Sequence, residues 1–283
     1  MATDVAATTT YDRATGIGAI GRYGLLIAVS ALVLFPVYTT VIAAFKPRNR
    51  VLNNPLVPDS FTLSIFQDAW TEGRLGRYLL NSAVVAIVVT VFQVSTSVLS
   101  AYAFALLDFP GRNVAFVVFI ATLLVPLEAT MVVNRRTVDS LGWLNSYQGL
   151  IVPFLATAFG TFLVRQVLLT LPRDLRDAAA IDGVGHVGFL RHVAVPLIRP
   201  TLGALALFSF LGNWNSYLWP RLVTTEPSMN TVQSGLARLK TQGLDSPNLI
   251  MAGTIIAAIP IFAILMVFQR QLVRGLTAGA VKG

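Results

Sequence analysis

Cysteine is absent from this chain of 283 residues, and histidine occurs only twice, at His186 and His192. Without cysteine, neither a disulfide framework nor a thiolate metal site can form. The two histidines are six positions apart, which places them on different faces of a helix. The chain also lacks the HExxH pair, the glycine-rich phosphate loop followed by lysine and the nucleophilic serine motif. We therefore expect no metal, no bound cofactor and no catalytic residue.

Charge is scarce as well, since Asp, Glu, Lys and Arg make up only 12% of the chain, against about 25% in ordinary soluble domains. Hydrophobic residues make up 55% and lie in long blocks, whereas a soluble core is built from short amphipathic stretches. This composition excludes a normally wetted surface. The formal charge of +8 is spread over the loops, which favours attraction to anionic lipid headgroups over a nucleic-acid partner.

Six apolar stretches are near the roughly 20 residues that a helix needs to cross a hydrocarbon core about 30 Å thick. The third stretch reaches that length only if Glu128 is included. Barrel strands would alternate apolar and polar residues, and runs such as 83–89 do not. The sequence therefore predicts an all-α membrane protein with about six transmembrane helices. The predicted spans are residues 23–45, 79–107, 113–134, 147–169, 200–220 and 248–269.

The first apolar stretch is too long for the core of a secretory signal, and Asp4 and Asp12 stand where a signal would carry cations. We therefore expect residues 1–21 to form an N-terminal tail and residues 22–283 to form a single transmembrane domain. Six spans put both termini on one side of the membrane. With that side taken as cytoplasmic, 11 of the 21 Lys and Arg residues lie on it, so charge asymmetry leaves the orientation open.

One long polar segment, residues 171–200, has a helical and amphipathic pattern but carries too many charges to span a membrane. Its pattern predicts a helix over 174–181, a break at Gly183 and Gly185, and a second helix over 186–193 that stops before Pro196. Glycine at the break supplies the positive φ that a sharp turn between two helices requires.

The spacing within this segment resembles the cytoplasmic signature loop of ABC importer permeases, which reads Glu-Ala-Ala, three residues, Gly, nine residues, Ile, one residue, Leu-Pro. The residues that stand at these positions are Asp177, Ala178, Ala179, Gly183, Val193, Val195 and Pro196. The departures, Asp for Glu and Val for Ile and Leu, conserve charge or apolarity. Residues 109–113 and 274–283 also look like segments of the sugar-permease branch. The chain thus resembles the maltose-transporter-like permeases over most of residues 22–283.

This resemblance implies a bacterial inner-membrane permease with both termini and the loop 172–199 in the cytoplasm. The implied partners are a second permease subunit forming a heterodimer, two cytoplasmic ATPase subunits that hold ATP and Mg, and an extracytoplasmic solute-binding protein. The implied substrate is a carbohydrate, with glycerol-3-phosphate or a related polyol phosphate as the alternative. The residues expected to couple the loop to an ATPase are Asp177, Ala178, Ala179, Ile181, Gly183 and Pro196.

Candidates for the substrate path are Glu128 and the cluster Asn213, Trp214 and Asn215. An acid within a membrane segment is a functional hypothesis by default, although Glu128 could equally pair with a nearby arginine. Amides beside aromatic rings suit sugar binding, and an interfacial aromatic belt has the same composition. A stand-alone secondary transporter would need coupling groups near the midplane, where only Glu128 is available. An intramembrane enzyme would need a catalytic pair, and the sequence shows none.

Overall fold

The computed structural model describes residues 16–50, 56–239 and 247–277, with the side chains of 16–19, 49 and 270–277 left aside. Every regular element in these ranges is helical, which confirms the predicted all-α class. The first 15 residues of the predicted tail lie outside the described ranges. From residue 16 onward, the tail is already part of the first helix.

The helices differ greatly in length, and the longest are α1, α3 and α14. The first half of the chain forms α1 (Gly16–Phe45), α2 (Ser64–Thr71), α3 (Leu75–Leu106), α4 (Arg112–Ala121), α5 (Leu127–Ser140) and α6 (Tyr147–Ile151). The second half forms α7 (Ala158–Leu168), α8 (Arg173–Ile181), α9 (His186–Phe189), α10 (Val195–Leu197), α11 (Arg199–Trp214), α12 (Leu218–Val223), α13 (Val232–Leu239) and α14 (Pro247–Thr277). Short turns join them at Arg48–Arg50, Thr122–Leu124, Val152–Phe154, Leu190–Ala194 and Pro227–Met229.

Four helical segments of the described chain are long and apolar enough to cross a membrane, and two bent pairs raise the number to six if each pair is one span. The expected continuous span 113–134 is instead bent by 96° between Leu124 and Leu127. Pro126 explains the bend, because its ring disfavours a helical conformation at the residue before it. Val125 is accordingly extended, with φ −82° and ψ 116°.

The expected fifth span, 200–220, is shorter than the sequence pattern suggested. Helix α11 ends at Trp214, and α12 is a separate short helix after a break. At its other end, α11 is bent by 79° from the helical run His186–Leu197. Residues 200–220 carry no charged side chain, so the length of this charge-free stretch could not place the break after Trp214.

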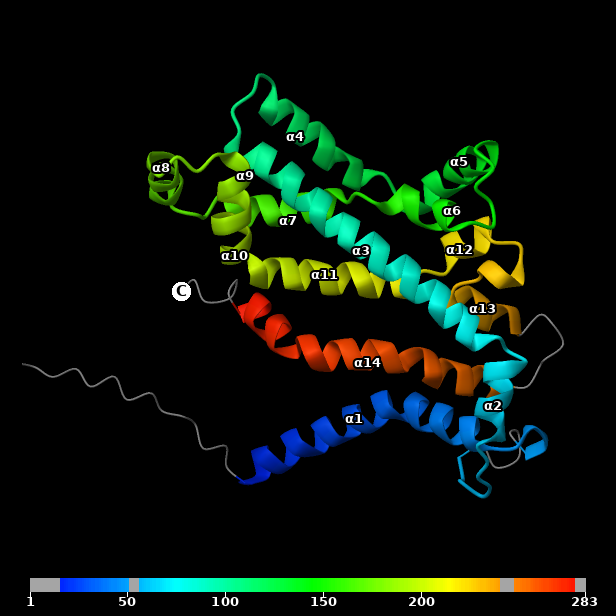
Figure 1. Ribbon diagram of the computed structural model, residues 1–283. Coiled ribbons are helices and arrows are strands. Elements are labelled where there is room, and N and C mark those ends of the chain that lie inside the picture. The colour runs from blue at the N-terminus through cyan, green and yellow to red at the C-terminus, as the bar shows by residue number, and fades with distance from the viewer. Residues whose placement is uncertain (1–15, 51–55, 240–246, 278–283) are drawn as a thin grey trace, which may run out of the picture.

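Helices α1, α14 and α11 lie in that order across the molecule, α3 runs diagonally across α7 and α11, and α4 lies at the side opposite α1 (Figure 1). Helix α3 is central and packs against α7 on one side and α11 on the other. Its approach to α7 is close: a Cβ on Gly160 would come within 2.3 Å of the Ser97 hydroxyl. Where the two helices meet, the hydroxyls of Ser100 and Thr161 form a hydrogen bond of 2.7 Å. Small and hydroxylated residues thus join these helices, as is usual inside membranes.

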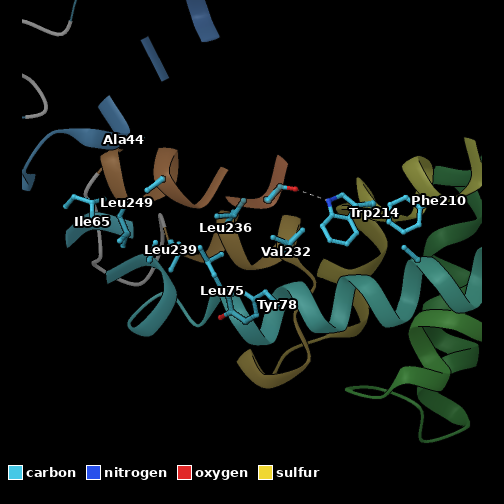
Figure 2. Close-up of a cluster of buried hydrophobic side chains, with 14 residues drawn as sticks. Ala44, Ile65, Leu75, Tyr78, Phe210, Trp214, Val232, Leu236, Leu239 and Leu249 are labelled. Atoms are coloured by element: carbon cyan, nitrogen blue, oxygen red, sulfur yellow. Dashed lines mark hydrogen bonds between the residues drawn. The ribbon is translucent and has the colours of Figure 1, made fainter. Parts of the chain in front are cut away.

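The two ends of the bundle are built differently (Figure 1). We call the end that carries α8, α9 and α10 the elbow end, and the end that carries α2, α5, α6, α12 and α13 the cap end. Helix α1 begins and α14 ends at the elbow end. Three apolar clusters fill the interior, one of which joins α2, α3, α11, α13 and α14 around Trp214 and Leu75 (Figure 2).

Candidate coupling elbow and membrane cleft

The first limb of the elbow is α8, which starts after Pro172 and carries Asp174 in its first turn, where a negative charge favours the helix dipole. The helix ends in a Schellman motif. Gly183 has φ +74°, its N–H donates to Ala180 O, and Val184 N–H donates to Ala179 O at 2.8 Å. The predicted glycine break is therefore present, and it turns the chain sharply into α9.

The side chains of α8 divide into an outward and an inward set. Asp177 and Ala178 are exposed, and Ile181 is 87% exposed. Ala179 is only 8% exposed and belongs to a buried cluster with Phe189. Its small side chain therefore packs α8 against the bundle, and its part in coupling the loop to an ATPase stays a prediction.

The sequence pattern predicted that the second helix of the elbow stops before Pro196, but the helical run continues past it. Helix α9 continues into a π-helical turn, Leu190–Ala194, and then into α10, which contains Pro196. Proline has no N–H to donate and its ring crowds the carbonyl four residues earlier, so a regular α-helix is disfavoured here. The wide π turn directly before α10 accommodates the proline without ending the helical run.

Two polar contacts fasten the elbow to the last turns of α3. Arg176 on α8 donates to Leu106 O at 3.2 Å, and the Tyr102 hydroxyl is hydrogen-bonded to His186 Nδ1 at 3.0 Å. The carbonyls at a helix C-terminus lack partners within the helix and carry partial negative charge, so a guanidinium group suits them. Each limb of the elbow thus has its own contact with α3.

Two more arginines bind carbonyls in the same turns of α3. Arg165 donates to Phe104 O at 3.2 Å, and Arg112 donates to Leu107 O at 2.9 Å. The Arg165 guanidinium also lies 4.0 Å from the centre of the Phe116 ring, a cation–π contact. The C-terminal turns of α3 therefore connect α4, α7 and the elbow.

A cleft of about 340 Å³ lies between α3, α7 and α11, on the side toward the cap end. This volume is within the range of roughly 300–1,000 Å³ that small-molecule sites occupy. Its lining combines aliphatic, aromatic and uncharged polar side chains and contains no charged side chain among the described residues. The residues that matter below are Gln93, Phe159, Phe208, Ser209, Gly212, Asn213 and Ser216.

Of the four residues proposed for a substrate path, the structure brings only Asn213 to this cleft. Trp214 is 2% exposed, stacks on Phe210 and donates from Nε1 to Ala257 O on α14 (Figure 2). Asn215 binds Leu211 O and accepts a hydrogen bond from Gln233. Glu128 is exposed in the first turn of α5, and its neighbour Leu127 lines the cleft in its place.

Sequence reasoning missed Gln93, Phe208, Ser209 and Ser216. The available signal was the helical period, because positions 205, 208, 209, 212 and 213 share one face of α11. A search of the described residues finds no group of three or more His, Asp or Glu side chains placed to hold a metal ion.

Comparison with known proteins connects this architecture to a family. Residues 80–278 match the model of the family described as "Binding-protein-dependent transport system inner membrane component". The chain belongs to this family. The protein is therefore a multi-pass permease subunit of an ABC importer.

Curated relatives align with nearly the whole permease. The sn-glycerol-3-phosphate transport system permease protein UgpE of Yersinia pestis is 37% identical over 262 residues, which is 89% of this chain and 93% of the relative. The arabinooligosaccharides transport system permease protein AraQ of Halalkalibacterium halodurans is 33% identical over 260 residues, covering 90% and 93%.

Solved structures agree on the fold of the permease. A chain of a bacterial ABC transporter that imports the acidic polysaccharide alginate superposes with a TM-score of 0.80 at 21% identity, covering 93% of this chain and 99% of that chain. A chain from the alginate transporter in complex with its alginate-pentasaccharide-bound periplasmic protein gives 0.65 at 14% identity, covering 90% and 96%. The expected ABC importer permease fold is confirmed.

Proposed function

We propose that this permease couples to a cytoplasmic ATPase through the elbow α8–α10 and forms half of a translocation path for a carbohydrate. The elbow end, with both termini, then faces the cytoplasm, and residues 22–283 act as one transmembrane domain. The other members of the complex are a second permease, two ATPase subunits that hold ATP and Mg, and an extracytoplasmic solute-binding protein. In this complex the present chain acts as a transport subunit, and ATP is hydrolysed on the ATPase subunits.

The observation that carries the proposal is the exposed apolar side chain at the tip of the elbow. Ile181 is 87% exposed beside Asp177 and Asp182 and next to the glycine turn at Gly183. An amphipathic helix of this kind is suited to enter a groove on a partner, and its flanking charges fix the register. Ala179 and the contacts of Arg176 and His186 with α3 give the elbow the stiffness that a lever requires.

Motion of the elbow would reach the membrane helices through packed contacts. ATP-driven closure of an ATPase dimer would displace the two elbows of a permease pair together. Because α8 and α9 each contact the end of α3, the displacement would be passed to α3 and to the helices α7 and α11 packed on it. Such a rigid-body switch between two packings is an established form of conformational change.

The substrate class rests on the relatives and on the cleft. The relatives are named for glycerol-3-phosphate and for arabinooligosaccharides, so a sugar and a polyol phosphate are both supported by likeness. The cleft lining of amides, hydroxyls and aromatic rings favours the sugar. A polyol phosphate is the second candidate.

The complete importer, purified in mild detergent and reconstituted with its binding protein, tests this function. We expect an ATPase subunit to copurify with the permease. Uptake should require MgATP on the side of the vesicle membrane that the elbow faces. Uptake that persists without ATP, from a protein that purifies without an ATPase, would replace this proposal with a secondary transporter.

A further inference from the structure

We propose that the cleft between α3, α7 and α11 binds the transported molecule directly and selects an uncharged, hydroxyl-rich ring over a phosphorylated polyol. This inference rests on the proposed import function and goes beyond it, because it assigns substrate contact to this subunit. The polar groups of the cleft come from α3, from α11 and, for Ser216, from the break between α11 and α12. Its exposed aromatic rings, Phe159 and Phe208, come from α7 and α11.

The polar atoms in the cleft have capacity to bind a ligand. Asn213 donates from Nδ2 to Ser209 O, and Gln93 donates from Nε2 to Phe154 O. Within the described part of the chain, the amide oxygens of both residues and the hydroxyls of Ser209 and Ser216 have no hydrogen-bond partner. Two amide acceptors and two hydroxyls, which donate or accept, match the hydroxyl groups of a sugar.

Two exposed phenylalanine rings complete the chemistry of a sugar site. Phe159 is 50% exposed and Phe208 is 53% exposed, although both line the cleft. The apolar C–H face of a sugar ring can cover such a ring while its hydroxyls bind the amides. A pocket of apolar walls with a few placed polar groups is the usual form of a small-molecule site.

The charge of the cleft argues against a phosphorylated substrate. A phosphate monoester carries about −1.5 to −2 charges at pH 7, and proteins bind such groups with arginine or lysine side chains, often together with a helix N-terminus such as that of α7 at Thr157 and Phe159. No charged side chain is among the described lining residues. Glu128 follows the lining residue Leu127 and Arg221 follows the lining residue Pro220, so these two charges next to the lining in sequence are of opposite sign.

Gly212 offers a way to close the cleft without disturbing the fold. It lies on the lining face of α11, and a Cβ built on it meets no atom within 4 Å. Glycine is therefore not required there for packing or for backbone conformation. Side chains of increasing size at this position should fill the cleft progressively.

Saturation-transfer NMR on the complete detergent-purified importer, without binding protein, tests the inference. The probes are arabinotriose, maltotriose and sn-glycerol-3-phosphate. We expect a signal from at least one sugar and none from glycerol-3-phosphate.

The variants test whether this signal comes from the cleft. The sugar signal should decrease in the order Gly212→Ala, Gly212→Val and Gly212→Leu, and Asn213→Leu should weaken sugar binding about threefold to tenfold. The matched control is Asn215→Leu, at an amide outside the cleft, which should leave the signal unchanged.

Three results would overturn the inference. The first is the absence of any sugar signal, and the second is a sugar signal that Gly212→Leu does not reduce. The third is a glycerol-3-phosphate signal that Gly212→Leu reduces. Measuring ATP hydrolysis in the same samples distinguishes a failure of the cleft inference from a failure of the proposed function. An importer that holds its ATPase and hydrolyses ATP keeps the proposed function even where the cleft is shown not to bind sugar. A chain that purifies without an ATPase fails the proposed function, whatever the NMR result.

Discussion

The cap end and the elbow end of this permease are held together by different means. At the cap end, Asn81 is fully buried, donates to Ser228 O and Asn230 O at 2.8 Å each, and accepts from the Tyr147 hydroxyl at 2.7 Å. Asn145, with φ +54°, accepts hydrogen bonds from two consecutive backbone N–H groups through its side chain. The elbow projects from the bundle and is fastened by two side-chain contacts with α3 and by a buried apolar cluster of ten residues that it shares with α3, α7 and α11.

This difference indicates where the molecule is built to stay fixed and where it is built to be moved. Buried hydrogen bonds between distant segments hold the cap end in one arrangement. The elbow has an exposed outer surface, two polar contacts with α3 and an apolar inner face packed against α3, α7 and α11. Substitutions at the cap end should therefore reduce stability, and substitutions on the elbow should reduce coupling with little change in stability.

The largest effect is expected from Ile181→Asp. A charge at the tip of the elbow would be buried without a partner in the ATPase groove, which should reduce MgATP-driven uptake by more than about tenfold. Ile181 is exposed, so the melting temperature of the isolated permease should not change. The matched control is Leu141→Asp, at an exposed leucine of the cap end. Equal uptake by both variants would contradict the coupling role.

A second prediction concerns the cap end, where Asn81→Leu removes the partner of two carbonyls and one hydroxyl. We expect a loss of about 2–3 kcal/mol of unfolding free energy, measured by thermal or denaturant unfolding in detergent. The protein that remains folded should transport with an unchanged ratio of substrate to ATP. Asn113→Leu, at an exposed amide on α4, is the control and should be neutral. If Asn81→Leu lowered the amount of substrate moved per ATP without lowering stability, the claim that the cap end serves stability would be wrong.

A smaller effect is expected from Tyr102→Phe, which removes only the hydroxyl that binds His186. Loss of one hydrogen bond should change the unfolding free energy by less than about 1.5 kcal/mol. If that bond transmits motion from α9 to α3, the amount of substrate moved per ATP should fall by a few fold while ATP hydrolysis continues. A ratio equal to that of the wild type would show that the contact is only structural.

The smallest effect is expected from acid at the cap end. The hydrogen bond from the buried Lys46 ammonium, at 3.1 Å, lowers the pKa of Asp59 below its ordinary value. The stabilising contribution of this pair is present above the unfolded pKa of about 3.9 and is lost as pH falls through the folded value. The difference in melting temperature between the wild type and Asp59→Asn should therefore shrink below about pH 4. A difference that stays constant to lower pH would contradict the assignment.

Much of the fold was predictable because the charge-free stretches had the length of membrane spans and the glycine turn had a recognisable spacing. The bend at Pro126 was within reach of the sequence, since a proline restricts the residue before it. The inward direction of Ala179 and Trp214 was not, because each is set by contacts with residues distant in sequence, Phe189 and Ala257. In α11, Ser209 and Asn213 lie four residues apart on one face, but this spacing does not distinguish a cleft from a contact with another helix.

The exposure of the elbow to the cytoplasm is the most direct test of the account. The chain has no cysteine, so single-cysteine variants report one position each. Ile181→Cys marks the elbow tip, and Ser140→Cys marks the cap end. In intact cells, a membrane-impermeant maleimide should label the cap-end cysteine and not the elbow cysteine, and permeabilisation should expose both. Labelling of Ile181→Cys from outside intact cells would contradict the central claim that a cytoplasmic ATPase drives this elbow.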